Sequence, residues 1–370
     1  MNKGNILFLG CGQAGNQILS EILKKNKRYS GVFINSNYTD LDGLYGVADN
    51  LHNVIIFDGL NGAGRNRDVA KGYLKDQLPL VTDKVLDYQT RNIINIICSS
   101  DGGTGSGIVP NLIRVLKTLT NKTINLIFVL PNYETANILS LSNAVDFWND
   151  IFMPQTDKRG NTFKIEDMLN DIKVIDNSKL NGDYKAINKR IADDIDMAYS
   201  IVGKDIEGNI DVADSETVNL QKGFSTILSL PQGMNSTDAI KTAMKDSIFI
   251  SNLDTTCTYA AISCKKNEYN KNTLAKELKV TREIYSTYNE KFNVIVQSGI
   301  KPIPLYAIER INNRKNTLEN QIKHVEDEDK FIRVDKSNTV DETNKVNHED
   351  PILYTQDNID DILEDLADLI

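Results

Sequence analysis

The segment Ser99-Ser100-Asp101-Gly102-Gly103-Thr104-Gly105-Ser106-Gly107 decides the fold of this chain. It follows an apolar, strand-like run at 92–98 (NIINIIC), and a helical pattern begins at Ile108. A strand that passes through glycines into a helix N-terminus leaves backbone N–H groups exposed, and the helix dipole favours an anion there. The segment therefore predicts a phosphate-binding loop, with a flexible turn as the simpler alternative.

A second glycine-rich loop, Gly10-Cys11-Gly12-Gln13-Ala14-Gly15, follows a strand-like run at 5–9 (NILFL). It leads into a helical pattern near Asn16. The loop matches the dinucleotide pattern GxGxxG, which by itself is weak. That pattern also requires an acidic residue at the end of the second strand, but 31–37 (GVFINSN) ends in uncharged polar residues. An NAD-dependent oxidoreductase that uses Gly10–Gly15 is therefore an alternative with less support.

A third glycine-rich loop, Gly59–Asn66, follows the strand-like run 53–58 (NVIIFD). Three such loops at three strand ends give one nucleotide several phosphate contacts. The pattern GxxxxGK[ST] does not occur in the sequence, which argues against an ordinary P-loop NTPase.

Taken together, these loops resemble the tubulin/FtsZ superfamily of filament-forming GTPases. Gly102–Gly107 matches the family signature GGGTG(S/T)G, with Asp101 in place of the leading glycine. Gly12–Ile18 is similar to the first loop of tubulin, and Gly62–Ala70 is similar to the third loop of FtsZ. The motifs occur in the order found in the family, and the resemblance covers roughly residues 4–300.

The resemblance implies that the chain binds GTP or GDP, with Mg²⁺ on the phosphates and few direct protein ligands for the metal. Tyr184 and Asn188, one helical turn apart, would offer guanine an aromatic surface and an amide. Asn177-Ser178-Lys179-Leu180 resembles the NDKL loop of the family, whose Asn also contacts the base. The implied nucleotide contacts are Gly12, Gln13, Ala14, Asn16, Gly62, Ala63, Gly64, Gly102, Gly103, Thr104, Gly105, Ser106, Gly107, Glu134 (to the ribose), Asn177, Tyr184 and Asn188.

Two aspartates in Gly208–Val218, Asp211 and Asp214, have the spacing found in the hydrolysis loop of FtsZ. An acidic loop is more often only solvated, but the resemblance implies that these carboxylates orient the water that attacks the γ-phosphate. In the family this loop lies at the far end of a core helix, and a helix of ~20 residues spans roughly 30 Å. A second subunit, stacked head to tail, would therefore complete the active site, and such a contact propagates into a filament.

The near-continuous apolar runs between residues 5 and 178 are typical of parallel strands covered on both faces. We therefore expect an α/β fold with a doubly wound parallel sheet. The expected units are a GTP-binding domain (1–183), a core helix (184–203), a second, smaller α/β domain with the catalytic loop (204–300), a C-terminal helix (301–325) and a polar linker with an acidic amphipathic tail (326–370).

Within the second domain, the patterns predict helices near 237–246 and 272–289 and strands at 225–230, 257–263 and 292–297. The final segment, Asp357–Ile370, places apolar residues at helical spacing with acidic residues between them. Either this tail packs on its own chain, or it binds a neighbouring subunit or another protein, because a polar tether permits both.

The composition excludes several classes of protein. The sequence has 370 residues and no run of about 18 apolar residues, so no membrane-spanning segment is expected. The net charge of −9 argues against direct binding to nucleic acid or to an anionic membrane. The four cysteines lack metal-ligand spacing, and the first residues lack a signal-peptide pattern, so we expect a cytoplasmic protein without a structural metal.

Within the superfamily, the sequence is most like the TubZ proteins of plasmids and phages. Gln13-Ala14 in the first loop, Asp101 before the signature and the acidic end favour this branch over a cell-division FtsZ. The resemblance implies dynamic filaments that move DNA through a DNA-bound adaptor of the TubR type. A divergent division GTPase, a phage tubulin that positions phage DNA and a non-hydrolysing scaffold are the alternatives.

Overall fold

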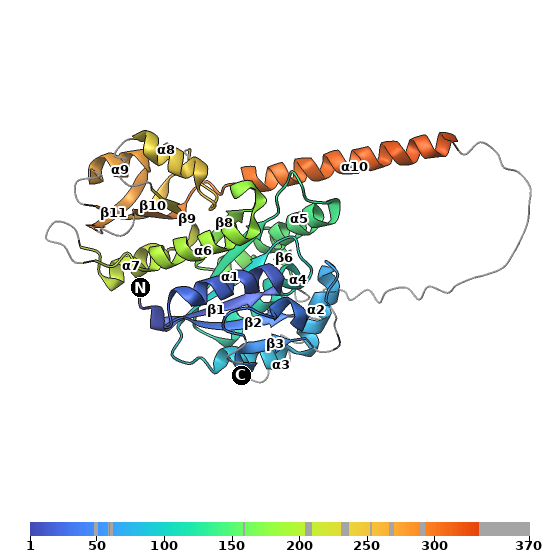
Figure 1. Cartoon of the computed structure of the whole chain (residues 1–370), viewed down its shortest axis with the longest axis horizontal. Helices are drawn as coiled ribbons and strands as arrows, with labels where there is room; N and C mark the ends of the chain where they lie inside the picture. The colour runs from blue at the N-terminus through green and yellow to red at the C-terminus, as the bar shows by residue number, and fades with distance from the viewer. Residues whose placement is uncertain are drawn as a thin grey trace, which may run out of the picture.

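The computed structural model describes residues 1–332 apart from 48–50, 58, 60–61, 158–159, 204–208, 231–236, 252–253, 266–269 and 289–292. The predicted acidic tail at 357–370 lies outside the described residues, as does the predicted linker from residue 333 onward. Figure 1 shows the whole chain.

One ten-stranded sheet, in the order β11-β10-β12-β9-β8-β5-β4-β1-β2-β3, runs through the molecule. Its first part consists of parallel strands: β1 (Ile6–Cys11), β2 (Ser30–Asn35), β3 (Val54–Ile56), β4 (Ile93–Ser99), β5 (Thr123–Leu130) and β8 (Asp171–Asp176). Its second part consists of β9 (Gly223–Ser229), β12 (Val294–Ile300), β10 (Cys257–Cys264) and β11 (Val280–Tyr288). In this part β12 is antiparallel to both β9 and β10. A separate hairpin pairs β6 (Gln155–Thr156) with β7 (Thr162–Phe163).

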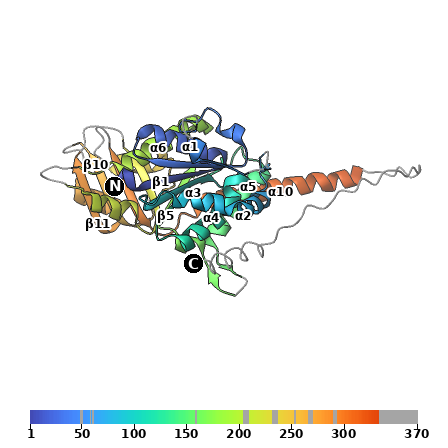
Figure 2. The same ribbon diagram turned by 90° about the horizontal axis from the view of Figure 1, so that it is seen from below.

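Helices cover both faces of the sheet, because the strands bury side chains on both sides. Leu7 and Leu9 of β1 belong to one buried cluster, and Ile6 and Phe8 belong to the other. Figure 2 shows the two helical layers. One layer contains α1 (Gly12–Lys25), α6 (Tyr184–Tyr199) and α7 (Val212–Asn219); the other contains α2 (Arg67–Asp76), α3 (Leu78–Leu86), α4 (Thr104–Leu119), α5 (Ile138–Phe152), α8 (Thr237–Asp246), α9 (Lys271–Glu277) and α10 (Tyr306–Ile332). The predicted doubly wound α/β fold is confirmed.

The predicted helix at 272–289 is wrong. The structure places the short helix α9 at Lys271–Glu277 and the strand β11 at Val280–Tyr288. Lys279, between them, has a φ of 49°, which ends the helix. The residues that follow are rich in β-branched and aromatic side chains, and they pair in parallel with β10.

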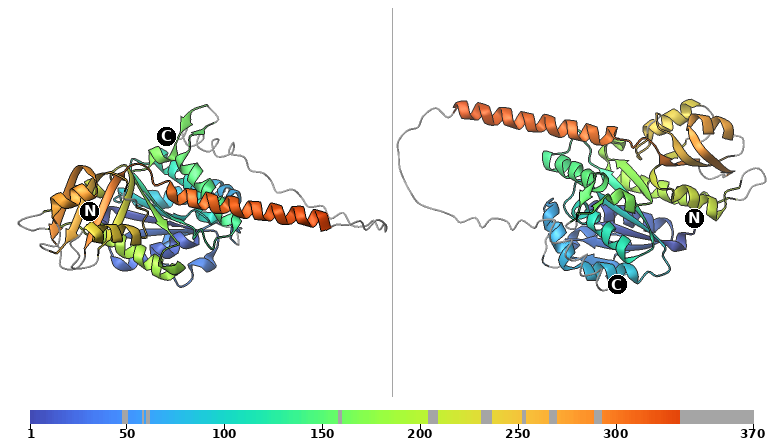
Figure 3. Two further views of the ribbon diagram at one scale, coloured as in Figure 1. Left: turned by 90° about the horizontal axis from the view of Figure 1, so that it is seen from above. Right: turned by 180° about the vertical axis from the view of Figure 1, so that it is seen from behind.

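Two helix ends also differ from their predicted positions. Helix α4 begins at Thr104, inside the glycine-rich segment, rather than at Ile108. Helix α10 continues to Ile332, beyond the expected end at 325. The start of α10 packs against α5, and its remainder projects away from the body of the molecule (Figure 3).

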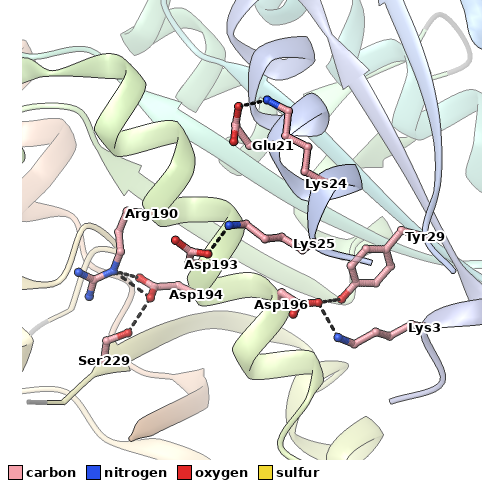
Figure 4. A network of polar contacts seen from close by, with 10 residues as sticks. All are labelled: Lys3, Glu21, Lys24, Lys25, Tyr29, Arg190, Asp193, Asp194, Asp196 and Ser229. Atoms are coloured by element: carbon pink, nitrogen blue, oxygen red, sulfur yellow. Dashed lines mark hydrogen bonds and ion pairs between the residues drawn. The ribbon is translucent and has the colours of Figure 1, made fainter. Parts of the chain in front are cut away.

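Helix α6 is held to both parts of the sheet by polar contacts of residues 190–196 (Figure 4). Asp196 accepts hydrogen bonds from Lys3 Nζ at 2.5 Å and from Tyr29 Oη at 2.8 Å. Asp193 pairs with Lys25 of α1. On the other side, Asp194 pairs with Arg190 and accepts a hydrogen bond from Ser229 of β9 at 2.6 Å. These contacts fix the position of α6 between the two parts.

Asp196 should matter more for stability than its neighbour Asp193. In Asp196→Ala the ammonium of Lys3, whose side chain is only 9% exposed, loses its counter-ion. We expect the free energy of unfolding to fall by about 2–4 kcal/mol in urea denaturation. The matched control, Asp193→Ala, removes a carboxylate that is 40% exposed and should cost less than about 1 kcal/mol. Equal losses in the two variants would contradict this account.

Candidate functional site

A cavity of about 610 Å³ lies at the carboxyl edge of the parallel strands. Ligands of open α/β sheets bind at this edge. Four strands, β1, β2, β4 and β5, and the N-termini of α1, α4, α5 and α6 contribute to its wall. The lining residues are Cys11, Gly12, Gln13, Ala14, Gln17, Asn35, Ser36, Asp40, Gly62, Ala63, Gly64, Arg65, Ser99, Asp101, Gly102, Gly103, Thr104, Gly105, Val129, Pro131, Asn132, Thr135, Ala136, Asn137, Ser140, Asn177, Tyr184 and Asn188.

The three glycine-rich loops contact one another through their backbones. A Cβ atom at Gly105 would lie 2.5 Å from the carbonyl oxygen of Cys11, and one at Gly12, whose φ is 73°, would lie 2.8 Å from the amide nitrogen of Gly105. A Cβ atom at Gly103 would lie 2.8 Å from the Cα atom of Arg65 in the third loop. These distances leave no room for a side chain. The glycines are therefore required by the packing of the loops against each other.

The helix N-termini make this cavity suited to an anion. The first residues of α1 and α4 line it, and so do Ala136, Asn137 and Ser140 at the start of α5. The first N–H groups of a helix have no partner within the helix, and the macrodipole places partial positive charge there. Three such ends around one cavity favour a ligand with several negative charges, such as a polyphosphate.

Side chains add hydroxyl groups and the carboxyl group of Asp101 beside the helix ends. The hydroxyl groups of Ser36 and Thr104 lie 2.7 Å apart. Arg65 donates a hydrogen bond to Ser140. Burial raises the pKa of Asp101, and the contacts of its carboxyl with Ser99 and Arg65 oppose that rise. The residue that replaces the leading glycine of the signature thus adds a partly compensated negative charge to the wall.

The residues predicted to contact the base gather at the other end of the cavity. Tyr184 is the first residue of α6 and is 55% exposed. Asn188, one turn later, donates a hydrogen bond from Nδ2 to Gln17 Oε1 at 3.3 Å. Asn177 follows the end of β8, and all three side chains line the cavity. An aromatic face and two amides are therefore available to a planar, polar ligand group.

Four predicted contacts lie outside the lining. Asn16 is buried and donates a hydrogen bond to the carbonyl oxygen of Ile34 at 3.0 Å. Ser106 donates a hydrogen bond to the carbonyl oxygen of Gly102, and Gly107 packs on the backbone of Arg67. Glu134 is exposed and accepts a hydrogen bond from the hydroxyl group of its neighbour Tyr133. Asn16, Ser106 and Gly107 thus contact neighbouring backbone and stabilise the loops without lining the cavity.

Several lining residues were not predicted from the sequence. A local signal exists for some of them. Asn35 ends β2 and Ser36 follows it, and Asn137 caps α5 by accepting a hydrogen bond from the Ser140 amide at 2.9 Å. Asp40 carries no such signal, since only its contact with Asn35 at 3.1 Å brings it to the cavity.

Asp211 and Asp214 lie away from this cavity. They form a capping box at the start of α7: Asp211 accepts a hydrogen bond from the Asp214 amide at 2.9 Å, and Asp214 accepts one from the Asp211 amide at 3.1 Å. Tyr184 at the N-terminus of α6 lines the cavity, whereas α7 lies beyond the C-terminus of α6 (Figure 1). Helix α6 has 16 residues and is about 24 Å long. The two aspartates therefore cannot reach a ligand in the cavity of their own chain.

Two further features bear on the class of protein. The described part of the chain contains no group of three side chains that would form a metal site by themselves. Among the described helices, none combines the length and the apolar composition needed to cross a membrane.

The fold and the cavity define a nucleotide-binding α/β protein whose phosphate loops are rich in glycine. Residues 5–151 match the family model "Tubulin/FtsZ family, GTPase domain". This part of the chain thus resembles a GTPase domain of the tubulin/FtsZ family. The match includes Gly10–Gly15, which favours the GTPase interpretation of this loop over the dinucleotide pattern of an oxidoreductase.

The chain is similar to proteins of the TubZ type. It is 26% identical over 302 residues to the tubulin-like protein TubZ of Clostridium botulinum C phage, which covers 81% of this chain and 80% of that protein. The solved structure of tail-truncated TubZ from Clostridium botulinum phage c-st has a TM-score of 0.75 at 24% identity and covers 86% of this chain and 99% of that one. A GTPγS-form protofilament of TubZ from Bacillus thuringiensis serovar israelensis has a TM-score of 0.69 at 15% identity, with coverages of 88% and 94%. Both structures establish the fold.

The contact between Cys11 and Gly105 predicts that substitutions of two nearby glycines differ strongly in their effect on stability. Gly105→Ala places a methyl group against the backbone of Cys11 and should lower the free energy of unfolding by about 2–4 kcal/mol, measured in urea without nucleotide. In the control Gly102→Ala, the nearest atom is Ser99 Oγ at 3.3 Å, so stability should change by less than about 1 kcal/mol. A stable Gly105→Ala variant would refute the close packing of the loops.

Proposed function

We propose that this protein hydrolyses GTP and polymerises head to tail into dynamic filaments, with each active site completed by the next subunit. The observation that carries the proposal is the separation of the two predicted parts of the active site. The phosphate loops lie at one end of α6, and Asp211 and Asp214 lie at the other end. A filament in which one copy presents α7 to the cavity of the next copy reunites them. The protofilament form of a TubZ neighbour supports this arrangement.

In this proposal the triphosphate of GTP lies against the N-termini of α1, α4 and α5. Guanine lies toward Asn177, Tyr184 and Asn188, which line the same cavity. The donor set fits Mg²⁺: Ser36 and Thr104 would offer hydroxyl oxygens and Asp101 a carboxylate, and phosphate and water would supply the other ligands. When bound, Mg²⁺ would neutralise charge on the β- and γ-phosphates.

Asp211 and Asp214 of the neighbouring copy would orient and polarise the attacking water. Their capping box holds both carboxylates at the first turn of α7, which makes the pair part of a preformed helix end. Hydrolysis at the contact would remove the γ-phosphate from between two subunits and weaken the filament. GTP would thus favour assembly and GDP disassembly.

The proposed catalytic role of Asp211 and Asp214 can be tested separately from their role as helix caps. In Asp211→Asn and Asp214→Asn the side chains keep an acceptor oxygen for the cap but lose the charge. We expect GTP binding and assembly to be unchanged, GTP turnover to fall by at least about 100-fold and filaments to persist, as followed by phosphate release and light scattering. The unfolding transition should match that of the unchanged protein.

Turnover by the unchanged protein should also rise steeply with protein concentration above a threshold, because catalysis requires a contact between subunits. Loss of GTP binding in either aspartate variant would contradict the assignment, and so would turnover that is proportional to concentration throughout. In the first case the aspartates belong to the binding site; in the second the active site is complete in one chain.

We further propose that the filaments act in the cytoplasm and move plasmid or phage DNA through a DNA-bound adaptor of the TubR type. The similarity to TubZ proteins supports this function, and the net charge of −9 disfavours direct contact with DNA or an anionic membrane. A fluorescent fusion should form moving filaments whose ends follow a labelled plasmid or phage genome. A stationary ring at mid-cell would instead support a division GTPase.

A further inference from the structure

A second cavity, of about 330 Å³, lies next to the turn that follows β8. The turn, the helix α8 and the start of α10 surround it, and the nucleotide cavity lies on the other side of the same turn. Its lining residues are Asp176, Lys179, Lys241, Met244, Lys245, Ser247, Phe249, Ile250, Ser251, Tyr306 and Arg310.

This second cavity combines an apolar floor with a cationic rim. Met244, Phe249 and Ile250 are buried hydrophobic residues. Lys241 and Lys245, on the exposed side of α8, bring positive charge to the opening. The one acidic group in the described lining, Asp176, is neutralised by Arg310, whose Nη2 lies 3.0 Å from Oδ2. The cavity thus suits an occupant with apolar side chains and several carboxylates.

Lys241 and Lys245 are available for such an occupant. Lys241 has an acidic neighbour, Asp238, at 4.0 Å, but that carboxylate is 90% exposed and the pair is therefore weak. Lys179 has a different role, because its ammonium donates a hydrogen bond to the carbonyl oxygen of Lys245 at 2.6 Å and holds the turn to the end of α8.

The sequence of this chain contains a segment with the matching composition. Residues 357–370 include six acidic side chains and no basic one. Between the acidic residues, the apolar residues Ile359, Ile362, Leu363, Leu366 and Leu369 have the spacing of one helix face. An acidic amphipathic segment can place its apolar side chains on the floor and its carboxylates beside the lysines.

The length of chain between α10 and this segment suits contact within one molecule. From Arg310 to Ile332, α10 carries the chain about 33 Å away from the second cavity. Taken as a flexible tether, the 24 residues 333–356 would have a root-mean-square length of roughly 24–29 Å. An effective concentration is highest when the tether length matches the span, so the tail of the same chain competes well against that of another molecule.

We propose that residues 357–370 bind in the second cavity of their own chain, with apolar side chains on Met244, Phe249 and Ile250 and carboxylates beside Lys241 and Lys245. The proposal answers the question of the tail that the sequence leaves open, and it does not depend on GTP hydrolysis. It assigns to the tail a binding site on the surface of its own molecule.

Site-specific photo-crosslinking in the full chain tests this proposal. Leu363→p-benzoylphenylalanine places a photoreactive group on the apolar face of the tail, and irradiation without nucleotide should link it to Met244, Phe249 or Tyr306 by mass spectrometry. In a mixture of ¹⁴N- and ¹⁵N-labelled protein, the two peptides of each crosslink should carry the same isotope, because both come from one molecule. Links between isotopes, or links confined to another surface, would overturn the proposal.

Variants that reverse the charge of lysines in α8 test the proposed charge pairing, and the same change in α9 is the control. Lys241→Glu with Lys245→Glu should lower the crosslink yield by about tenfold, because two attractions become repulsions. Lys271→Glu with Lys276→Glu, which makes the same change on the exposed surface of α9, should leave the yield unchanged. Asp361→Lys with Asp365→Lys should restore the yield when combined with the α8 reversal. An unchanged yield after the α8 reversal, or no recovery in the combined variant, would refute the pairing of charges.

Discussion

The contact between the carbonyl group of Cys11 and the backbone of Gly105 is the constraint on which the rest of the structure depends. It joins the ends of the adjacent parallel strands β1 and β4 and thereby sets the starts of α1 and α4 side by side. Because each helix start presents unpaired N–H groups, their proximity creates an electropositive edge. Gly103 extends the same packing to the third loop through Arg65. The electrostatic character of the cavity therefore follows from close backbone packing.

Helix α6 runs from the nucleotide cavity to the opposite end of the molecule, so the two ends carry different residues. Its N-terminus contributes Tyr184 and Asn188 to the cavity, while its C-terminus leads toward α7 and the two aspartates. Contacts of Asp193 and Asp196 hold it to α1 and the N-terminal residues, and Asp194 holds it to β9. A helix fastened on both sides fixes the distance between the two ends. In the proposed filament, the two parts would therefore meet between copies stacked in one direction.

The parts of the structure that the sequence predicts are those governed by local rules. Buried parallel strands appear as apolar runs, and the glycine-rich loops mark the turns into α1 and α4. The sequence fails where tertiary pairing decides: the segment after Lys279 becomes β11 because β10 offers it a partner. Asp40 reaches the cavity only through the folded loop after β2. Asp211 and Asp214 show a further limit, since their spacing fits both a helix cap and a catalytic pair.

The turn after β8 contributes residues to the walls of both cavities. Asp176 Oδ1 accepts hydrogen bonds from the amide and the hydroxyl group of Ser178, and Oδ2 pairs with Arg310 of α10. The guanidinium of Arg310 also lies over the ring of Tyr133, 4.8 Å from its centre, in the loop between β5 and α5. Asn177 follows Asp176 directly in the chain, and Lys179 of the same turn donates a hydrogen bond to the carbonyl oxygen of Lys245 in α8. Consecutive residues of this turn thus line different cavities, Asp176 the second one and Asn177 the nucleotide cavity.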